Sequence, residues 1–388
     1  MSAMFDLPGD YVELQTEARA LARQIEPIAD EVDALSSIHP ELRRAFAASS
    51  LSDLMFPTRF GGRFETVDPL AICVVREALM PASGNLDSLF GMQGIGTYAL
   101  TTAGSDAQRE HWIPKVIAVD AIPALAITEP EAGTDVRAIT TELVPDGDGM
   151  VLRGTKAFIT NSPEAAFASV LAREGDDEYS MVLVPLDRDG VTVTEVAPLI
   201  APHVLGDIRF DDVAIEEADR IGARGKGFGL ILATLATFRV SVAGAAVGLA
   251  QAALEEAVLH TAGREQFGQP LARLGAVEER LADSWTEVEA ARLLTYRAAA
   301  AAKDDPRAAL GKSSMAKLYA TEVCGRVVDR AVQVMGRFGL VQGTKIERYY
   351  RQARPMRVYE GASEALRPGI ARELVADVQR RRDPGEDR

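Results

Sequence analysis

The sequence contains little cysteine and little histidine. Its 388 residues include two cysteines, Cys73 and Cys324, and no C-x-x-C pair. These numbers argue against a disulfide framework and against a thiolate metal site. The four histidines are scattered without ligand spacing, which argues against a histidine metal site. A cysteine-poor chain of this kind is typical of the reducing cytoplasm.

Long apolar runs are also missing. Residues 1–10 lack the charged segment and apolar run of a signal peptide. We find no stretch of about 18 uncharged apolar residues that would span a membrane. The sequence therefore predicts a cytoplasmic protein that is neither exported nor inserted in a membrane.

Basic charge is in deficit. The chain has 42 Lys and Arg against 57 Asp and Glu, for a net charge of -15. This charge repels phosphate backbones and disfavours nucleic acid as the main partner. Residues 232–388 nevertheless carry 24 basic and 20 acidic side chains, against 18 and 37 in the rest of the chain. These basic groups could face an anionic cofactor, but solvation or pairing with the acidic remainder is the commoner role.

The period of the apolar residues divides the chain into three parts. Residues 1–122 show helical spacing, broken near residues 57–62, 81–84 and 104. Residues 123–231 contain short runs of β-favouring residues separated by turn-formers, which predicts an antiparallel barrel or sandwich. Residues 232–388 return to long helical patterns at 230–262, 276–303, 307–335 and 360–378. We expect a multidomain α+β protein: an N-terminal helical domain, a central β domain and a C-terminal four-helix bundle.

Two common enzyme signatures are absent. No G-x-S-x-G elbow occurs, so a serine hydrolase is unsupported. The glycines at positions 222, 225, 227 and 229 precede a long helix, not a βαβ unit, so a flexible joint fits them better than a dinucleotide fingerprint.

Several motifs together resemble the acyl-CoA dehydrogenase family. Residues 126–136 read A-I-T-E-P-E-A-G-T-D-V and residues 156–161 read K-A-F-I-T-N. Residues 264–268 read R-E-Q-F-G, and Q-V-M-G, E-R-Y-Y-R and V-Y-E-G-A-S-E begin at positions 333, 347 and 358. Each motif alone is weak, but the ordered set covers nearly the whole chain. The resemblance implies an FAD-dependent enzyme that removes an α-proton and a β-hydride from an acyl thioester.

The resemblance also implies the catalytic base. Glu360, in Tyr-Glu-Gly, matches the base of the short- and medium-chain members, and its backbone N–H would help to bind the thioester oxygen. Another branch of the family places the base just before an arginine on the long helix. Here that arginine is Arg239 and the preceding residue is Phe238, which cannot accept a proton. The competing interpretation of Glu360 is a carboxylate at a helix N-terminus, stabilised by the helix dipole.

Binding residues follow from the same resemblance. Thr160 matches a hydroxyl near flavin N5, and Phe158 stands where many members have Trp. Without the other motifs, ordinary strand residues would be the favoured interpretation of Phe158, Ile159 and Thr160, and the ordered set of motifs favours the flavin role instead. The substrate would contact Thr134, Arg239 and Gly361. The residues expected to bind FAD are Ala126, Ile127, Thr128, Thr134, Phe158, Ile159, Thr160, Arg264, Phe267, Gln333, Gly336, Arg337, Ala362 and Glu364.

Departures from the family pattern leave alternatives open. Arg337, Ala362 and Glu364 replace the usual residues at the adenosine-diphosphate end of FAD, and the loop at 200–207 differs near the pantetheine. The acyl carrier is therefore CoA or an acyl carrier protein, and the electron acceptor is an electron-transfer flavoprotein or oxygen. A flavin-free binding or scaffold protein is the alternative of another class. The family precedent predicts a homodimer or homotetramer.

Overall fold

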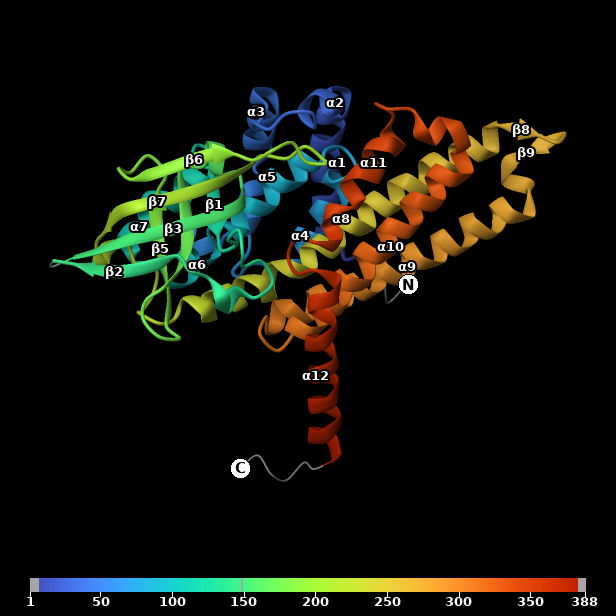
Figure 1. Cartoon of the computed structure of the whole chain (residues 1–388). Coiled ribbons are helices and arrows are strands. Elements are labelled where there is room, and N and C mark those ends of the chain that lie inside the picture. Colours follow the sequence, from blue (N-terminus) through green and yellow to red (C-terminus); the bar gives the residue numbers. More distant parts are fainter. Residues whose placement is uncertain (1–6, 148, 383–388) are drawn as a thin grey trace.

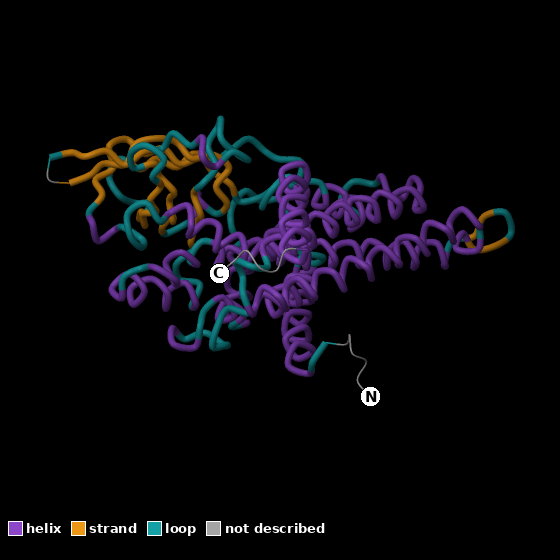
Figure 2. The backbone as a smooth tube through the Cα atoms, turned by 90° about the horizontal axis from the view of Figure 1, so that it is seen from below, coloured by secondary structure: helices purple, strands orange, loops and turns teal. Residues whose placement is uncertain are grey.

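The computed structural model describes residues 7–147 and 149–382. The prediction that residues 1–10 carry no signal peptide therefore lies partly outside the described residues. Helices precede a β-sheet and a second set of helices along the chain, as predicted (Figure 1). The strands gather at one end of the molecule, and the long helices extend away from them (Figure 2).

Helices make up the first part of the chain, and side-chain caps explain where several of them begin. The Asp68 carboxylate accepts from the amides of Leu70 and Ala71, and the Ser83 hydroxyl accepts from the amide of Leu86. The predicted breaks near residues 61, 81–84 and 104 fall between helices. The helices are α1 (Gly9–Ile25), α2 (Ala29–Val32), α3 (Pro40–Ser49), α4 (Pro69–Leu79), α5 (Gly84–Ile95), α6 (Tyr98–Ala103) and α7 (Asp106–Ile117).

A curled seven-stranded sheet forms the middle part. Its order is β1-β4-β2-β3-β7-β6, with β5 paired to β4. Most pairings are antiparallel as predicted, but β1 pairs with β4 in parallel, so the sheet is mixed. The sequence pattern did not predict β1 and β2. The strands are β1 (Pro123–Ala126), β2 (Glu142–Asp146), β3 (Gly149–Thr160), β4 (Phe167–Arg173), β5 (Tyr179–Pro185), β6 (Val191–Glu195) and β7 (Leu205–Ile215).

Three long helices dominate the last part. They are α8 (Gly227–Gly263), α9 (Gly275–Asp304) and α10 (Leu310–Met335), followed by α11 (Lys345–Ala353) and α12 (Ser363–Arg382). A short hairpin of β8 (Glu265–Gln266) and β9 (Gln269–Pro270) joins α8 to α9 at the far tip of the bundle (Figure 1). The sequence pattern did not predict α11, and α12 extends away from the body of the molecule.

Helix α4 ties the first part of the chain to the bundle by packing against α8 and α9. The contact with α8 is close because Gly248 has no side chain: a Cβ there would lie 2.0 Å from the Glu77 carbonyl oxygen. Helix α8 is long and apolar enough to cross a membrane, which the sequence analysis did not anticipate. Since 72% of its most apolar window is buried inside the protein, α8 has the burial of a core helix.

Several basic residues of the last third form ion pairs within the chain. Lys345 forms an ion pair with Glu26, and Arg348 Nη1 lies 2.6 Å from Asp30 Oδ1. Arg351 Nε lies 2.6 Å from a carboxylate oxygen of Glu347. For these three groups the intramolecular interpretation is confirmed.

Candidate active site

Glu360 lies in the loop that connects the short 3-10 turn Pro355–Arg357 to α12. Helix α12 begins at Ser363, so the predicted helix start at residue 360 is wrong. Glu360 and Gly361 have left-handed backbones, with φ of 54° and 106°. A Cβ at Gly361 would lie 2.8 Å from Leu366 Cδ2. This conformation excludes both residues from the helix and argues against a carboxylate within the first helical turn.

Arg239 holds this loop from the side of α8. Its Nε donates to the Glu360 carbonyl oxygen at 2.9 Å, and its Nη1 donates to Ser314 Oγ at 3.0 Å. Desolvation lowers the pKa of the Arg239 guanidinium, and the charge of Glu360 opposes that effect. The neighbouring Phe238 is fully buried and packs edge-on against Tyr98, with ring centroids 5.4 Å apart. Arg239 was predicted to contact substrate, and its hydrogen bonds here go to the base loop and α10.

The backbone amide of Glu360 differs from the amides of the two residues before it. Within the described residues it donates to no acceptor, whereas the preceding amides of Val358 and Tyr359 both donate to the Pro355 carbonyl. The Glu360 side chain is half-buried. A carboxylate and an unpaired amide on one residue can take a proton and donate a hydrogen bond to the same bound molecule.

The two segments expected to line the flavin lie side by side in the sheet. The amide of Ala157 donates to the Thr128 carbonyl at 2.8 Å, which joins the end of β1 to β3. A register shift in β3 between Lys156 and Ile159 turns Phe158 outward, with φ of 56° and 57% of its surface exposed. The Phe158 amide donates to Asp207 Oδ1 at 2.9 Å. An exposed aromatic face on a fixed backbone suits a planar ring system such as a flavin.

Some of the residues predicted to contact the flavin have side chains that are buried inside the sheet. Ala126 and Ile159 are buried in the hydrophobic core of the sheet, so their side chains pack inside the protein. The side chain of Ile159 is therefore that of an ordinary strand residue, which was the alternative interpretation of this position. Ile127 and Thr160 are half-buried at the same edge, and Thr160 pairs with Leu205 of β7. Thr134 lies exposed in the loop that follows β1.

The sequence reasoning missed a buried ion pair behind these segments. Lys156 Nζ donates to Glu129 Oε1 and to the Ile127 carbonyl oxygen, at 2.9 Å each. Glu129 also accepts from the amides of Thr140 and Thr141. Burial lowers the pKa of Lys156 to about 8. Both residues lie inside the quoted motifs, and a charged residue within an apolar strand was the available signal.

A third group of predicted contacts lies at the opposite end of the bundle, near the β8–β9 hairpin (Figure 1). The guanidinium groups of Arg264 and Arg337 each lie over the Phe338 ring, 5.0 Å from its centroid. Phe267 is 90% exposed. Gln333 and Gly336 lie at the end of α10 beside them. Arg264 follows the end of α8, a helix of 37 residues and about 55 Å that packs against β5 of the sheet near its beginning.

Ala362 and Glu364 lie apart from that group, next to the base loop. Ala362 is half-buried, and the Glu364 side chain is 85% exposed and 3.8 Å from Arg367. The structure therefore brings the predicted residues together in three places, and one chain alone does not combine the sheet group with the group around Phe338.

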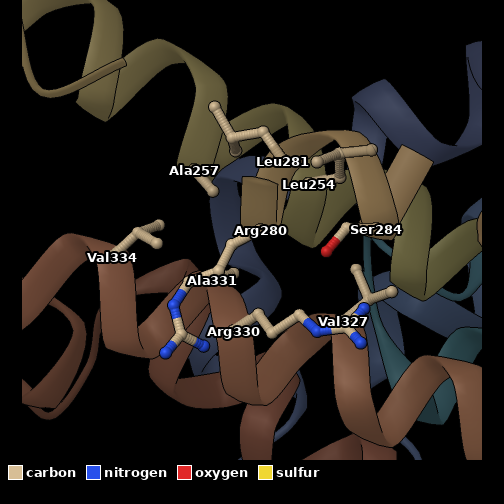
Figure 3. Close-up of a pocket in the computed structure, with 9 residues that line it drawn as sticks. All are labelled: Leu254, Ala257, Arg280, Leu281, Ser284, Val327, Arg330, Ala331 and Val334. Carbon is tan, nitrogen blue, oxygen red and sulfur yellow. The ribbon is translucent and has the colours of Figure 1, made fainter. Parts of the chain in front are cut away.

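Two hollows in the bundle are lined by none of these residues. A cavity of about 10 Å³ between α8, α9 and α10 has room for about one water molecule. Leu254, Ser284, Val327 and Arg330 are among the residues around it (Figure 3). A shallow groove of about 530 Å³ on α8 and α9 is lined by residues that include Leu259 and Trp285. Neither hollow includes Glu360 or Phe158.

Comparisons with known proteins assign the family. Family models of the acyl-CoA dehydrogenase N-terminal, middle and C-terminal domains match residues 10–120, 124–213 and 225–375. The cyclohexane-1-carbonyl-CoA dehydrogenase of Geobacter metallireducens is 31% identical, over 94% of this chain and 97% of its own length.

Solved structures agree with that assignment. The butyryl-CoA dehydrogenase of Megasphaera elsdenii superposes with a TM-score of 0.90 at 26% identity, covering 96% of this chain and 99% of the other. A chain from the structure of the electron transferring flavoprotein of Acidaminococcus fermentans has a TM-score of 0.90 at 28% identity, covering 95% and 99%. The chain belongs to the acyl-CoA dehydrogenase family, the FAD-dependent oxidoreductases that act on CH–CH bonds.

Proposed function

We propose that this protein desaturates an acyl-CoA between its α- and β-carbons, with Glu360 as the base that removes the α-proton. The observation that carries the proposal is the Glu360 loop. One residue presents a carboxylate and an unpaired amide while Arg239 fixes its carbonyl group at 2.9 Å. The first relatives and structures include enzymes named for acyl-CoA substrates, which supports CoA as the carrier.

The Glu360 residue has two tasks in this reaction. Its carboxylate takes the proton from the α-carbon, and its amide N–H donates a hydrogen bond to the thioester oxygen, where negative charge develops. FAD, when bound, accepts the hydride that leaves the β-carbon. Phe158 and the backbone of residues 126–128 would hold the flavin ring, and Thr160 and Thr134 would supply hydroxyl groups beside it. Gly361 allows substrate to approach the loop closely.

The separated predicted contacts support an assembly of two or four copies. Because Arg264, Phe267, Gln333, Gly336 and Arg337 lie at the end of the bundle away from the sheet, we propose that a second copy supplies them to the adenosine-diphosphate end of FAD. Helix α12 offers a further contact, since Leu374 and Val375 are 61% and 56% exposed on it.

We make three further proposals, each on an observation of its own. We propose domain boundaries near residue 122, where helices give way to strands, and near residue 231, close to the beginning of α8. An electron-transfer flavoprotein is the proposed acceptor, since one structural relative comes from such a protein. We also propose a cytoplasmic location, because both cysteines are buried free thiols.

The central test is anaerobic bleaching of the flavin absorbance by acyl-CoA thioesters of increasing chain length. The Glu360→Gln variant keeps the shape of the side chain and should bind FAD but lose bleaching by at least about 1000-fold. Asp329→Asn, an exposed carboxylate on α10, is the matched control and should bleach normally. Bleaching by Glu360→Gln at the wild-type rate would show that another group is the base. A colourless protein that cannot take up FAD would overturn the enzymatic proposal, and faster bleaching by acyl-carrier-protein thioesters would reassign the carrier.

A further inference from the structure

The loop that carries Glu360 is attached to α10. Three side chains of α10, Ser314, Lys317 and Glu322, make or support these contacts. Ser314 Oγ accepts from Arg239, Lys317 Nζ donates to the Gly361 carbonyl oxygen at 2.6 Å, and Glu322 Oε1 accepts from Ser363 Oγ at 2.6 Å. The helix thus contacts the base loop through Gly361, through Ser363 and, by way of Arg239, through Glu360.

Two consecutive carbonyl groups of the loop each accept from a cationic side chain. Arg239 donates to the carbonyl of Glu360, and Lys317 donates to the carbonyl of Gly361. Both residues have positive φ, a conformation that a glutamate rarely adopts without support from its surroundings. Hydrogen bonds from charged donors are the stronger kind. Because peptide groups are planar, holding these two oxygens also fixes the directions of the Gly361 and Ala362 amides.

Burying the charged Lys317 side chain at this position costs free energy. Its side chain is fully buried, and the Gly361 carbonyl is its hydrogen-bond acceptor in the described residues. Burial lowers the pKa of Lys317 to about 8, with Glu360, Glu322 and Glu364 opposing that effect and Arg239 adding to it. These four groups face it from the base loop, α10, α12 and α8. A methionine would fill the same space without burying a charge, so stability alone does not explain a lysine.

We propose that Lys317 is a positioning residue for α-proton abstraction: its hydrogen bond to the Gly361 carbonyl holds the base loop in the conformation that presents the Glu360 carboxylate and amide to the thioester. The inference rests on the proposed role of Glu360. Lys317 itself touches neither substrate nor flavin and acts through the loop. Arg239 donates to the neighbouring carbonyl group, that of Glu360, so two cations from α10 and α8 hold adjacent peptide groups.

The first test compares Lys317→Met and Lys317→Arg with the control Lys312→Met, an exposed lysine on the same helix. Lys317→Met should lower kcat for flavin bleaching by roughly 10- to 100-fold, the effect of a misplacement of about 1 Å, and leave KM within about twofold. FAD content and melting temperature should not fall. Lys317→Arg should recover most of the rate, and Lys312→Met should match the wild type. Loss of FAD or a lower melting temperature in Lys317→Met, with kcat per bound flavin unchanged, would mean that the lysine is merely structural.

A second measurement isolates proton removal from hydride transfer. Phenylacetyl-CoA has α-hydrogens but no β-hydrogen, so the enzyme can exchange its α-protons with deuterated solvent without desaturating it. Lys317→Met should slow this exchange by the same factor as kcat, and exchange at the wild-type rate would overturn the proposal. The wild-type rate should also decline above about pH 8 as Lys317 loses its proton, and this decline should be absent in Lys317→Arg, whose guanidinium stays charged.

The Glu360→Gln variant separates the two proposals. If it still exchanges α-protons, the base assignment fails, whatever Lys317 does. If Glu360→Gln abolishes exchange while Lys317→Met exchanges normally, the base assignment stands and the role of Lys317 is refuted. If both variants lose exchange and Lys317→Arg recovers it, both proposals are supported.

Discussion

Lys156 Nζ lies 2.9 Å from Glu129 Oε1 and 2.9 Å from the Ile127 carbonyl oxygen, so one buried ammonium group joins β3 to the segment after β1. Lys156 belongs to β3, and Glu129 and Ile127 belong to the segment after β1. Both segments are proposed to hold the flavin ring. The ion pair thereby couples the shape of the cofactor platform to the protonation of a buried carboxylate.

Glu129 should make stability depend on acid pH. Desolvation alone would raise its pKa, but Lys156 and the Thr140 amide outweigh that effect and hold it at about 2, below the ordinary 4.5. A depressed carboxylate stabilises the fold above pH 4.5, and this contribution of roughly 3 kcal/mol is lost as the pH falls from 4.5 through 2. Glu129→Gln should therefore lower the melting temperature at pH 6 and approach the wild type below pH 4. Glu131→Gln, exposed nearby, should behave as wild type throughout; a difference for Glu129→Gln that grows in acid would contradict the assignment.

The ion pair between α4 and α5 should be essential to stability. Arg76 Nε lies 2.9 Å from Asp87 Oδ1, its Nη1 donates to Ser241 Oγ at 2.9 Å, and both charged side chains are almost fully buried. Arg76→Met leaves the Asp87 carboxylate uncompensated and should cost about 3–5 kcal/mol of unfolding free energy in denaturant titrations. Adding Asp87→Leu should restore much of it. Arg153→Met, which breaks an exposed pair with Asp212, should leave the melting temperature unchanged. If Arg76→Met and Arg153→Met lower the free energy of unfolding by the same amount, the Arg76–Asp87 pair contributes no more than a surface pair.

His203 should stay neutral through the physiological pH range. Its Nε2 lies 3.1 Å from Ser88 Oγ, and desolvation lowers its pKa to about 4. Because the unfolded chain takes up this proton near pH 6.5, His203 should destabilise the fold progressively as the pH falls from 6.5 to 4. His203→Gln should flatten the dependence of the melting temperature on pH in that window. An imidazole NMR signal from His203 that titrates near pH 6.5 would refute the prediction.

Helix α12 should contribute to the assembly. Leu374, Val375 and Val378 lie on one side of it and are 61%, 56% and 40% exposed. Introducing a charge by Leu374→Glu should shift the sedimenting mass toward the 41.6 kDa monomer and weaken FAD retention. Gln379→Glu, an exposed change away from the centre of that stripe, should leave the mass unchanged. The same multimer in both variants would remove α12 from the interface.

The sequence by itself determined the order of helical, β and helical segments, because apolar period and turn residues act locally. The helices α8, α9 and α10 begin and end within a few residues of their predicted bounds, and β3 to β7 were all anticipated. The short strands β1 and β2 were not, since Pro123–Ala126 and Glu142–Asp146 have little β-favouring character and become strands by pairing with β4 and β3.

The motifs located Glu360, but only the tertiary structure decided what surrounds it. Arg239 lies 121 residues away from it in the chain, and Lys317 lies 44 residues from Gly361. No local pattern shows that two cations hold adjacent carbonyl groups, or that Glu360 stands before its helix with a positive φ. Such contacts depend on how α8 and α10 pack. Packing brings together residues that are far apart in the sequence, and the residues next to them in the chain do not reveal the contact.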